Sequence, residues 1–381
     1  LNKKKLIYSD SSTKFVGYTF RMTSFLKFAI LTCAVLAVAF ASTDGKCRAL
    51  IFAATTDAGA YHAGVIDGIL KNAADLSDYA YDVVIGSSVG GLNAAVFSQY
   101  PAGQETQASE ALLNLWTTIT RDNVYDYWAG GYVEGLLFKT SLVDSSPFQQ
   151  YLQNKLKTPL QRKVVIGASD ADNGNFTIWN EANLLHPSDL ARVLVASTAI
   201  PLYFPYVDFN SQTYIDGSLI DGTDIPDAVN RCMEIVSNHS DIIIDIVSTH
   251  DGHPVNVDAS NYNTMEMLQR FLEIYLYANE NFQYYLARLD YPDVNFRHVI
   301  QPSESLPGSF NPLGFDSENM ASDIAIGQKD GAAAMANGMY GNGLERMEKA
   351  VEWLHKNHGM FSKGIEKVKA INDKLRAKRL Q

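Results

Sequence analysis

Residues 81–96 constrain the fold most, because they have the pattern of a buried strand, a sharp turn and a helix. Residues 83–85 are Val-Val-Ile, which is typical of a strand that is covered on both faces. The next five residues fit the pattern G-x-S-x-G, with Ser88 between Gly86 and Gly90. The glycines make room for a serine on a tight turn, and the N-terminus of the following helix favours developing negative charge there. The stretch therefore indicates a nucleophile elbow that presents Ser88.

Short apolar runs alternate with segments of helical spacing along most of the chain. Residues 48–53 and 81–85 read as strands, and each is followed by a helix. Further strands are expected at 163–169 and 241–248. This alternation predicts an α/β fold with a mainly parallel central sheet flanked by helices. We expect one domain at residues 42–335, since neither a repeat nor a low-complexity linker divides it.

The beginning of the sequence is expected to lie outside that domain. Residues 1–21 read as a non-native or upstream segment. From Met22 onward, a lysine, an apolar run too short to span a bilayer and an A-x-A motif follow in order. This order predicts a signal peptide over residues 22–41, cleavage after Ala41 and a secreted protein, with an N-terminal signal anchor as the alternative.

Charge and cysteine content narrow the choice of partners and compartment. The 31 Lys and Arg against 42 Asp and Glu give a net charge of -11, which argues against a nucleic-acid partner. Cleavage after Ala41 would leave two cysteines, Cys47 and Cys232. They could form one disulfide in an oxidising compartment or remain two buried thiols, because the sequence does not give their distance.

Two kinds of base could activate Ser88. A Ser-His-Asp hydrolase needs a histidine late in the chain, and His250 and His298 lie near predicted strand ends. Neither has a signature around it. The other candidate is Asp216, which follows a short apolar strand and precedes a glycine. We predict no cofactor and no metal, because the sequence contains neither a nucleotide motif nor a calcium-binding loop.

Four features stand in one order: a strand ending in a turn–helix loop, G-S-S-V-G-G-L-N-A-A at 86–95, A-S-T-A-I-P-L-Y-F-P at 196–205, and Y-I-D-G-S around Asp216. Together they resemble the patatin-like phospholipase family, from about Cys47 to about Met335. The resemblance implies a patatin-like Ser-Asp hydrolase architecture, with Ser88 as nucleophile, Asp216 as base and no catalytic histidine.

The resemblance also implies a reaction and a substrate class. A phospholipase A or esterase would cleave a lipid or phospholipid ester through an acyl-enzyme that water then clears. An aspartate has a low unperturbed pKa, so it must be partly desolvated to act as the base.

The sequence departs from the family at the loop that would bind the oxyanion. The family pattern resembles G-G-G-x-R/K-G, whereas residues 54–59 are Ala-Thr-Thr-Asp-Ala-Gly. The backbone N–H groups of Thr55, Thr56 and Asp57 are the predicted donors, although threonines resist the φ > 0 that glycine allows. Asp57 also brings negative charge. The alternative is therefore a catalytically silent patatin-like lipid-binding or storage protein. A second, milder departure is Ser218, where the family prefers Gly or Ala.

Two segments suggest contact with lipid. Residues 336–381 are predicted to form a basic helical tail. Within residues 360–381, the sequence has seven basic residues and only two acidic ones. Such a helix could contact a membrane surface transiently or dock by its apolar stripe. Aromatic residues in a glycine-containing loop are either surface packing or the rim of an apolar cleft. They are Tyr125, Tyr127, Trp128 and Tyr132.

Overall fold

The computed structural model describes residues 44–250, 256–307 and 311–336, together with Glu352 and Lys356. The segment 1–21, the predicted signal peptide at 22–41 and nearly all of the tail at 336–381 lie outside the described residues. Those assignments stay predictions. Among the described helices, none has both the length and the apolar character needed to cross a bilayer.

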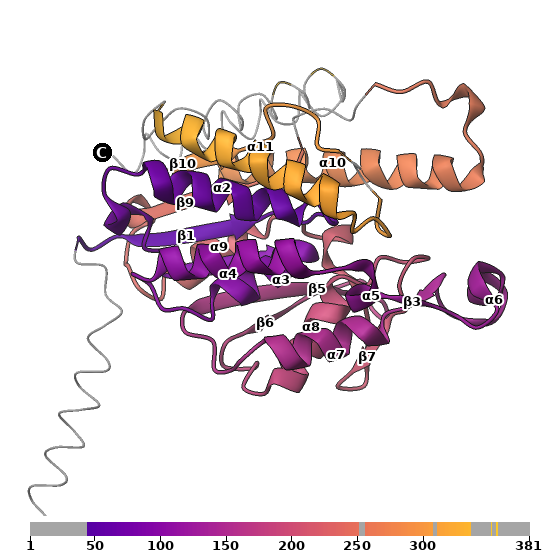
Figure 1. Ribbon diagram of the computed structural model, residues 1–381. Helices are drawn as coiled ribbons and strands as arrows, with labels where there is room; N and C mark the ends of the chain where they lie inside the picture. Colours follow the sequence, from indigo (N-terminus) through magenta and orange to yellow (C-terminus); the bar gives the residue numbers. More distant parts are fainter. Residues whose placement is uncertain (1–43, 251–255, 308–310, 337–351, 353–355, 357–381) are drawn as a thin grey trace, which may run out of the picture. The chain divides into compact units, whose positions relative to one another are not determined.

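A central sheet of eight strands organises the domain (Figure 1). Its order is β10-β9-β1-β2-β5-β8-β7, and β6 also pairs with β5. The five strands from β10 to β5 are parallel, whereas β6, β7 and β8 pair antiparallel. This confirms the predicted α/β fold with a mainly parallel sheet. The strands are β1 (Cys47–Phe52), β2 (Val83–Ser87), β5 (Lys163–Asp170), β6 (Phe176–Asn180), β7 (Val207–Phe209), β8 (Gln212–Asp216), β9 (Ile242–Val247) and β10 (Asn295–Ile300).

Helices flank this sheet, and several begin with recognisable signals. Proline occupies the first turn of α7, α8 and α9, where its missing N–H costs nothing. Asn263 and Glu266 form a capping box at the start of α10. The helices are α2 (Gly59–Asn72), α3 (Val89–Phe97), α4 (Glu105–Thr118), α5 (Arg121–Val124), α6 (Gly131–Phe138), α7 (Ser146–Lys155), α8 (Pro187–Ser197), α9 (Ile225–Cys232), α10 (Thr264–Asp290) and α11 (Ser317–Ala336).

The two faces of the sheet carry separate hydrophobic cores. In β1, Leu50 and Phe52 belong to the cluster that includes side chains of α2, α3, α4 and α8. Ala49 and Ile51 belong to the other cluster, with side chains of α9 and α10. Because side chains alternate across a strand, a strand buried on both faces must be apolar at successive positions. This explains the continuous apolar runs in the sequence.

Cys47 at the start of β1 and Cys232 at the end of α9 form a disulfide, with their Cα atoms 5.5 Å apart. Of the two alternatives that the sequence left open, the structure has the disulfide. It joins an interior strand of the sheet to a helix that covers one face.

Four glycines bring α2 and α11 into close contact. A Cβ added at Gly64 would lie 2.2 Å from the carbonyl oxygen of Ile324, and one at Gly68 would lie 2.3 Å from that of Gln328. The facing glycines on α11, Gly327 and Gly331, are equally close to the α2 backbone. The helices can approach this closely only because no side chain separates them.

We predict that Gly64→Ala destabilises the domain, although alanine is the better helix former by about 1 kcal/mol. The added methyl group would force α2 and α11 apart, so the free energy of unfolding should fall by about 1–3 kcal/mol. Urea unfolding of the variant beside Ala325→Ser, on the exposed side of α11, measures the effect. An unchanged midpoint for Gly64→Ala would contradict the close packing.

Candidate active site

Ser88 lies at the turn between β2 and α3, where the sequence predicts a nucleophile elbow. Its φ of 55° and ψ of -135° fall in a region that non-glycine residues rarely adopt. The turn is tight: a Cβ added at Gly86 would lie 2.2 Å from the carbonyl oxygen of Gly90, and one at Gly90 would lie 2.2 Å from that of Phe52. Both flanking glycines are therefore required by the space around the serine.

Asp216, at the end of β8, contacts Ser88 directly. The Ser88 hydroxyl donates a hydrogen bond to Oδ2 of Asp216 at 2.7 Å, and both residues are buried. The other carboxylate oxygen, Oδ1, accepts bonds from the backbone N–H and the hydroxyl of Ser218, at 2.8 and 2.6 Å. The residue that departs from the family pattern thus holds the carboxylate in place.

The surroundings of Asp216 change its acidity. Burial raises the pKa of Asp216 to about 6, and the hydrogen bonds from Ser218 and Ser88 oppose part of that rise. A carboxylate with such a pKa is a stronger base than an exposed aspartate and is still ionised at neutral pH. The arrangement suits removal of a proton from the Ser88 hydroxyl.

Sequence reasoning did not single out Ser197, at the end of α8. Its hydroxyl oxygen accepts a hydrogen bond from the Ser88 backbone N–H at 2.8 Å and donates to the carbonyl of Gly167 in β5 at 2.6 Å. It thereby fixes the elbow to the neighbouring strand. Ser197 lies within the family-like segment 196–205, but nothing in its spacing reveals a contact across 109 residues.

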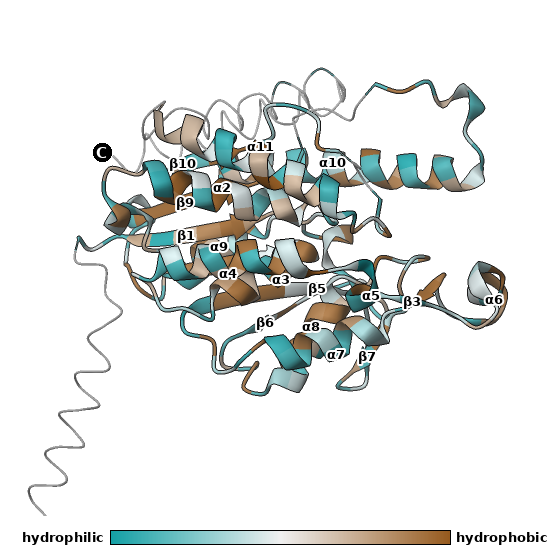
Figure 2. Ribbon diagram, in the orientation of Figure 1, coloured by the Kyte–Doolittle hydropathy of each residue, from teal (hydrophilic) through white to brown (hydrophobic). Residues whose placement is uncertain are grey.

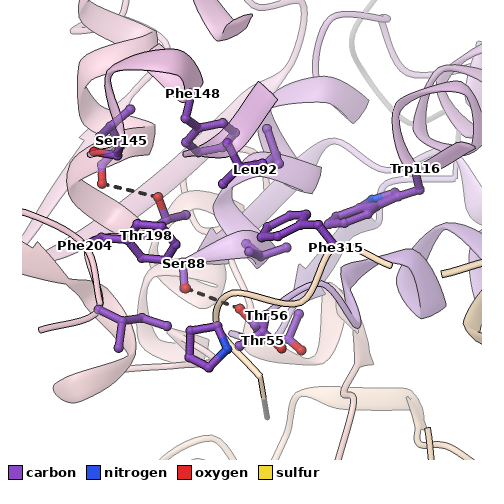
Figure 3. A pocket seen from close by; sticks show the side chains of 15 residues that line it. Thr55, Thr56, Ser88, Leu92, Trp116, Ser145, Phe148, Thr198, Phe204 and Phe315 are labelled. Carbon is purple, nitrogen blue, oxygen red and sulfur yellow. Dashed lines mark hydrogen bonds between the residues drawn. The ribbon is translucent and has the colours of Figure 1, made fainter. Parts of the chain in front are cut away.

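The loop at residues 54–57 lies beside Ser88. Thr55, Thr56 and Asp57 all keep φ outside the left-handed region, so the loop does not require the conformation that glycine favours. Among the described residues, no acceptor is hydrogen-bonded to the backbone N–H of Thr55 or Thr56. The Ser88 hydroxyl also lies 3.4 Å from the carbonyl oxygen of Thr55 (Figure 3).

The Asp57 side chain joins this loop to the segment just before α11. Its carboxylate accepts hydrogen bonds from the Phe315 backbone N–H at 3.0 Å and from the Thr56 hydroxyl at 3.2 Å. Burial raises the pKa of Asp57. Asp323 on α11 is also buried; its burial and the charge of Asp57 raise the pKa of Asp323 to about 7. The Asp57 carboxylate, which the sequence predicts to bring negative charge to the oxyanion loop, is thus hydrogen-bonded to Phe315 and Thr56.

The histidines of the described chain take no part in the Ser88 contacts. His250 pairs with Glu280 at 2.5 Å, and His298 lies 3.3 Å from the Tyr79 hydroxyl. His62 is buried against Asn93, and burial lowers the pKa of His62 to about 3. Within the residues described, the geometry supports the aspartate as base. In the same part of the chain, no group of three or more His, Cys, Asp or Glu could hold a metal ion.

Two pockets meet at Ser88. The apolar pocket, shown in Figure 3, has an empty volume of about 500 Å³. The second pocket has about 750 Å³ and is called the polar pocket here because its lining, although mostly apolar, includes more polar surface than that of the first. Both are lined by Ser88, Thr55, Thr56 and Ile200. The apolar pocket is also lined by Val89, Leu92, Trp116, Val124, Ser145, Phe148, Val195, Thr198, Phe204, Pro312 and Phe315. The polar pocket adds Ala54, Ala58, Ser218, Gly222, Thr249, His250, Glu273, Leu276, Asn279, Glu280 and Leu306.

The four aromatic residues considered as a cleft rim do not line either pocket. Tyr125 is buried and packs against Phe204, which does line the apolar pocket. Tyr127 and Tyr132 pack against each other, and Trp128 lies under Lys139. The packing interpretation therefore fits these residues better than the rim interpretation.

A family model described as patatin-like phospholipase matches residues 57–229. The match includes the elbow and Asp216, and it confirms the resemblance seen in the sequence: the chain carries a patatin-like phospholipase region. This match supports a lipid hydrolase function. The loop residues Thr55 and Thr56 precede the matched range. No curated protein matches the sequence.

Two solved structures resemble the chain weakly. They are VipD from Legionella pneumophila, with 10% identity and a TM-score of 0.35, and the type III effector protein ExoU, with 11% identity and a TM-score of 0.37. The alignments cover 77% of this chain and 67% of VipD, and 88% of this chain and 63% of ExoU.

We predict that Ser197→Ala destabilises the domain by about 1–3 kcal/mol, because it leaves the Ser88 N–H and the Gly167 carbonyl buried without their partner. Ser98→Ala is the matched control, since the buried Ser98 hydroxyl has no hydrogen-bond partner among the residues that the structure describes. Urea unfolding should show a loss for Ser197→Ala only. Equal effects of the two substitutions would show that the Ser197 bonds contribute nothing.

Proposed function

We propose that this chain is a secreted patatin-like lipid acyl hydrolase of the phospholipase A or esterase type. The observation that carries the proposal is the 2.7 Å hydrogen bond from Ser88 to a buried Asp216, at the meeting point of two pockets. An apolar pocket suits a fatty acyl chain, and a polar pocket beside it suits the alcohol part of the ester.

The proposed reaction has two steps. Asp216 takes the Ser88 proton while the serine oxygen attacks the ester carbonyl, and the free N–H groups of Thr55 and Thr56 receive the oxyanion. The C–O bond to the alcohol then breaks, and the alcohol leaves with the proton held by Asp216. A water molecule then attacks the acyl-enzyme carbonyl and gives its proton to Asp216. The bond between the acyl carbon and the Ser88 oxygen breaks, Asp216 returns the proton to Ser88, and the fatty acid is released.

Secretion is part of the proposal. The signal peptide predicted at residues 22–41 supports it, and so does the disulfide between Cys47 and Cys232, since disulfides persist mainly in oxidising compartments. The substrate would then be a lipid or phospholipid outside the cell, with transient contact to a membrane surface. The reaction needs neither a cofactor nor a nucleic acid.

One observation favours the alternative of a catalytically silent lipid-binding or storage protein. The Ser88 hydroxyl lies 3.4 Å from the Thr55 carbonyl oxygen, which would repel an oxyanion placed at that point. The loop without glycines also lies outside the matched part of the family model. Losing one oxyanion donor typically lowers the rate by about 10²–10³-fold.

We expect the chain to hydrolyse a medium-chain p-nitrophenyl ester, and Ser88→Ala and Asp216→Asn each to lower kcat by about 10³-fold or more. Asp221→Asn is the matched control: this neighbouring aspartate binds the Thr223 and Asp224 backbone N–H groups, and asparagine can do the same. A folded wild-type protein without turnover would favour the silent alternative. Restoring glycines at 54–56 and a basic residue at 58 would then test the loop.

The pH profile should report Asp216. Because the base must be ionised and burial raises its pKa to about 6, kcat/KM should fall about tenfold per unit below pH 6. Ser218→Ala removes a hydrogen bond that lowers this pKa, so the midpoint should move to higher pH. Steady-state rates between pH 4 and 9 measure both, and a midpoint unaffected by Ser218→Ala would assign the titration to another group.

A further inference from the structure

Helix α6 exposes nearly all of its large apolar side chains. Its sequence is GYVEGLLF, and only Gly135 is buried, against the backbone of Ser141 and Leu142. The exposed apolar residues are between 47% and 79% accessible. Part of α6 is coloured brown in Figure 2, which marks hydrophobic residues. They are Tyr132, Val133, Leu136, Leu137 and Phe138. A continuous apolar surface of this kind marks an interaction site.

The base of α6 has a different composition from its tip. The rings of Tyr127 and Tyr132 meet at 5.2 Å, and the Lys139 ammonium lies 4.7 Å from the centre of the Trp128 ring. Lys139 also pairs with Glu134 at 3.3 Å, so these two charges compensate each other. Segments that lie in a lipid–water interface have this arrangement: aromatic rings and lysines lie at the polar boundary, and aliphatic side chains extend from there into the lipid.

The supports of α6 connect it to the apolar pocket. Val124 precedes the segment, Ser145 follows it, and both line that pocket. Between them, β3 (Asp126–Tyr127) and β4 (Val143–Asp144) pair antiparallel and form a short stalk that carries α6. The N–H of Leu142 also bonds to the carbonyl of Leu202 at 2.8 Å, close in sequence to Ile200, which lines both pockets.

A second exposed apolar surface belongs to the first half of α10. Met267, Phe271 and Ile274 are exposed there, whereas Glu273 and Leu276 of the same helix line the polar pocket. In Figure 1, α6 and the beginning of α10 extend toward the same side of the domain. Each pocket therefore has an exposed apolar helix beside it.

We propose that α6 inserts into the surface of zwitterionic or uncharged lipid, with the first half of α10 resting on the same surface. The net charge of -11 disfavours an anionic surface, and the exposed side chains of α6 other than Glu134 carry no charge. Lipid binding stands on these observations alone. The further statement, that the bound enzyme takes its substrate from this surface through the apolar pocket, rests on the proposed function.

The test uses the purified chain and phosphatidylcholine vesicles in a flotation assay. The double substitution Leu136→Ser with Leu137→Ser should weaken vesicle binding about a hundredfold, because each leucine removed from lipid costs about tenfold. The matched control is Leu76→Ser with Leu185→Ser, two leucines that are 47% and 57% exposed elsewhere. Binding through apolar insertion should survive about 1 M NaCl, which screens charge interactions.

A second variant reports insertion directly. In Phe138→Trp, the new indole should be quenched by vesicles of brominated phosphatidylcholine. The α6 double variant should keep wild-type turnover of a monomeric p-nitrophenyl ester but lose turnover of the same acyl ester presented in vesicles.

Three results would overturn the proposal: vesicle binding by the α6 variant equal to that of the wild type, equal loss in the leucine control, or a dimer in sedimentation that the α6 substitutions dissociate. The last result would assign α6 to a second copy of the chain. Failure of the proposed function is distinguishable, because it would abolish turnover of every ester while vesicle binding remained.

Discussion

The hydrogen bond between Ser88 and Asp216 requires the end of β2 and the end of β8 to meet, although β5 lies between them in the sheet. A bond of 2.7 Å between residues on separate strands tolerates little movement. Ser197 contributes by tying the Ser88 backbone to β5, and Ser218 holds the far oxygen of the carboxylate. The closely packed glycines of the elbow, Gly86 and Gly90, also hold Ser88 in position, since a side chain at either would displace the serine.

Burial destabilises the ionised form of Asp216 and, by raising its pKa, also makes it a stronger base. An ionised carboxylate that is removed from water is destabilised unless donors surround it. Asp216 has three such donors, from Ser88 and Ser218, and burial still leaves its pKa near 6. Fewer donors would raise the pKa of Asp216 further, and more donors would lower it and make the carboxylate a weaker base. The site therefore depends on a partial, not complete, satisfaction of the carboxylate.

Local patterns predicted much of this structure but few of its distant contacts. The family resemblance implied the pair of Ser88 and Asp216, and the sequence left the disulfide open as one of two alternatives. The elbow and the apolar strands follow from residues near one another in sequence, so their positions could be predicted directly. The Ser197 bond, the glycine contact between α2 and α11, and the Asp57 bond to Phe315 join segments 109 or more residues apart. They depend on the sheet order, which periodicity does not determine. The exposure of the apolar face of α6 could not be predicted either, because an apolar run normally indicates burial.

In the reaction proposed above, the meeting of the two pockets at Ser88 has a consequence for the acyl-enzyme. When the first alcohol leaves, the acyl chain remains in the apolar pocket while the polar pocket empties. Water is then not the only nucleophile that can enter the polar pocket. The hydroxyl group of another molecule can also enter it and give its proton to Asp216. A chain with this geometry would move acyl groups between alcohols wherever lipid hydroxyls outcompete water, so its products would depend on the medium as well as on the enzyme.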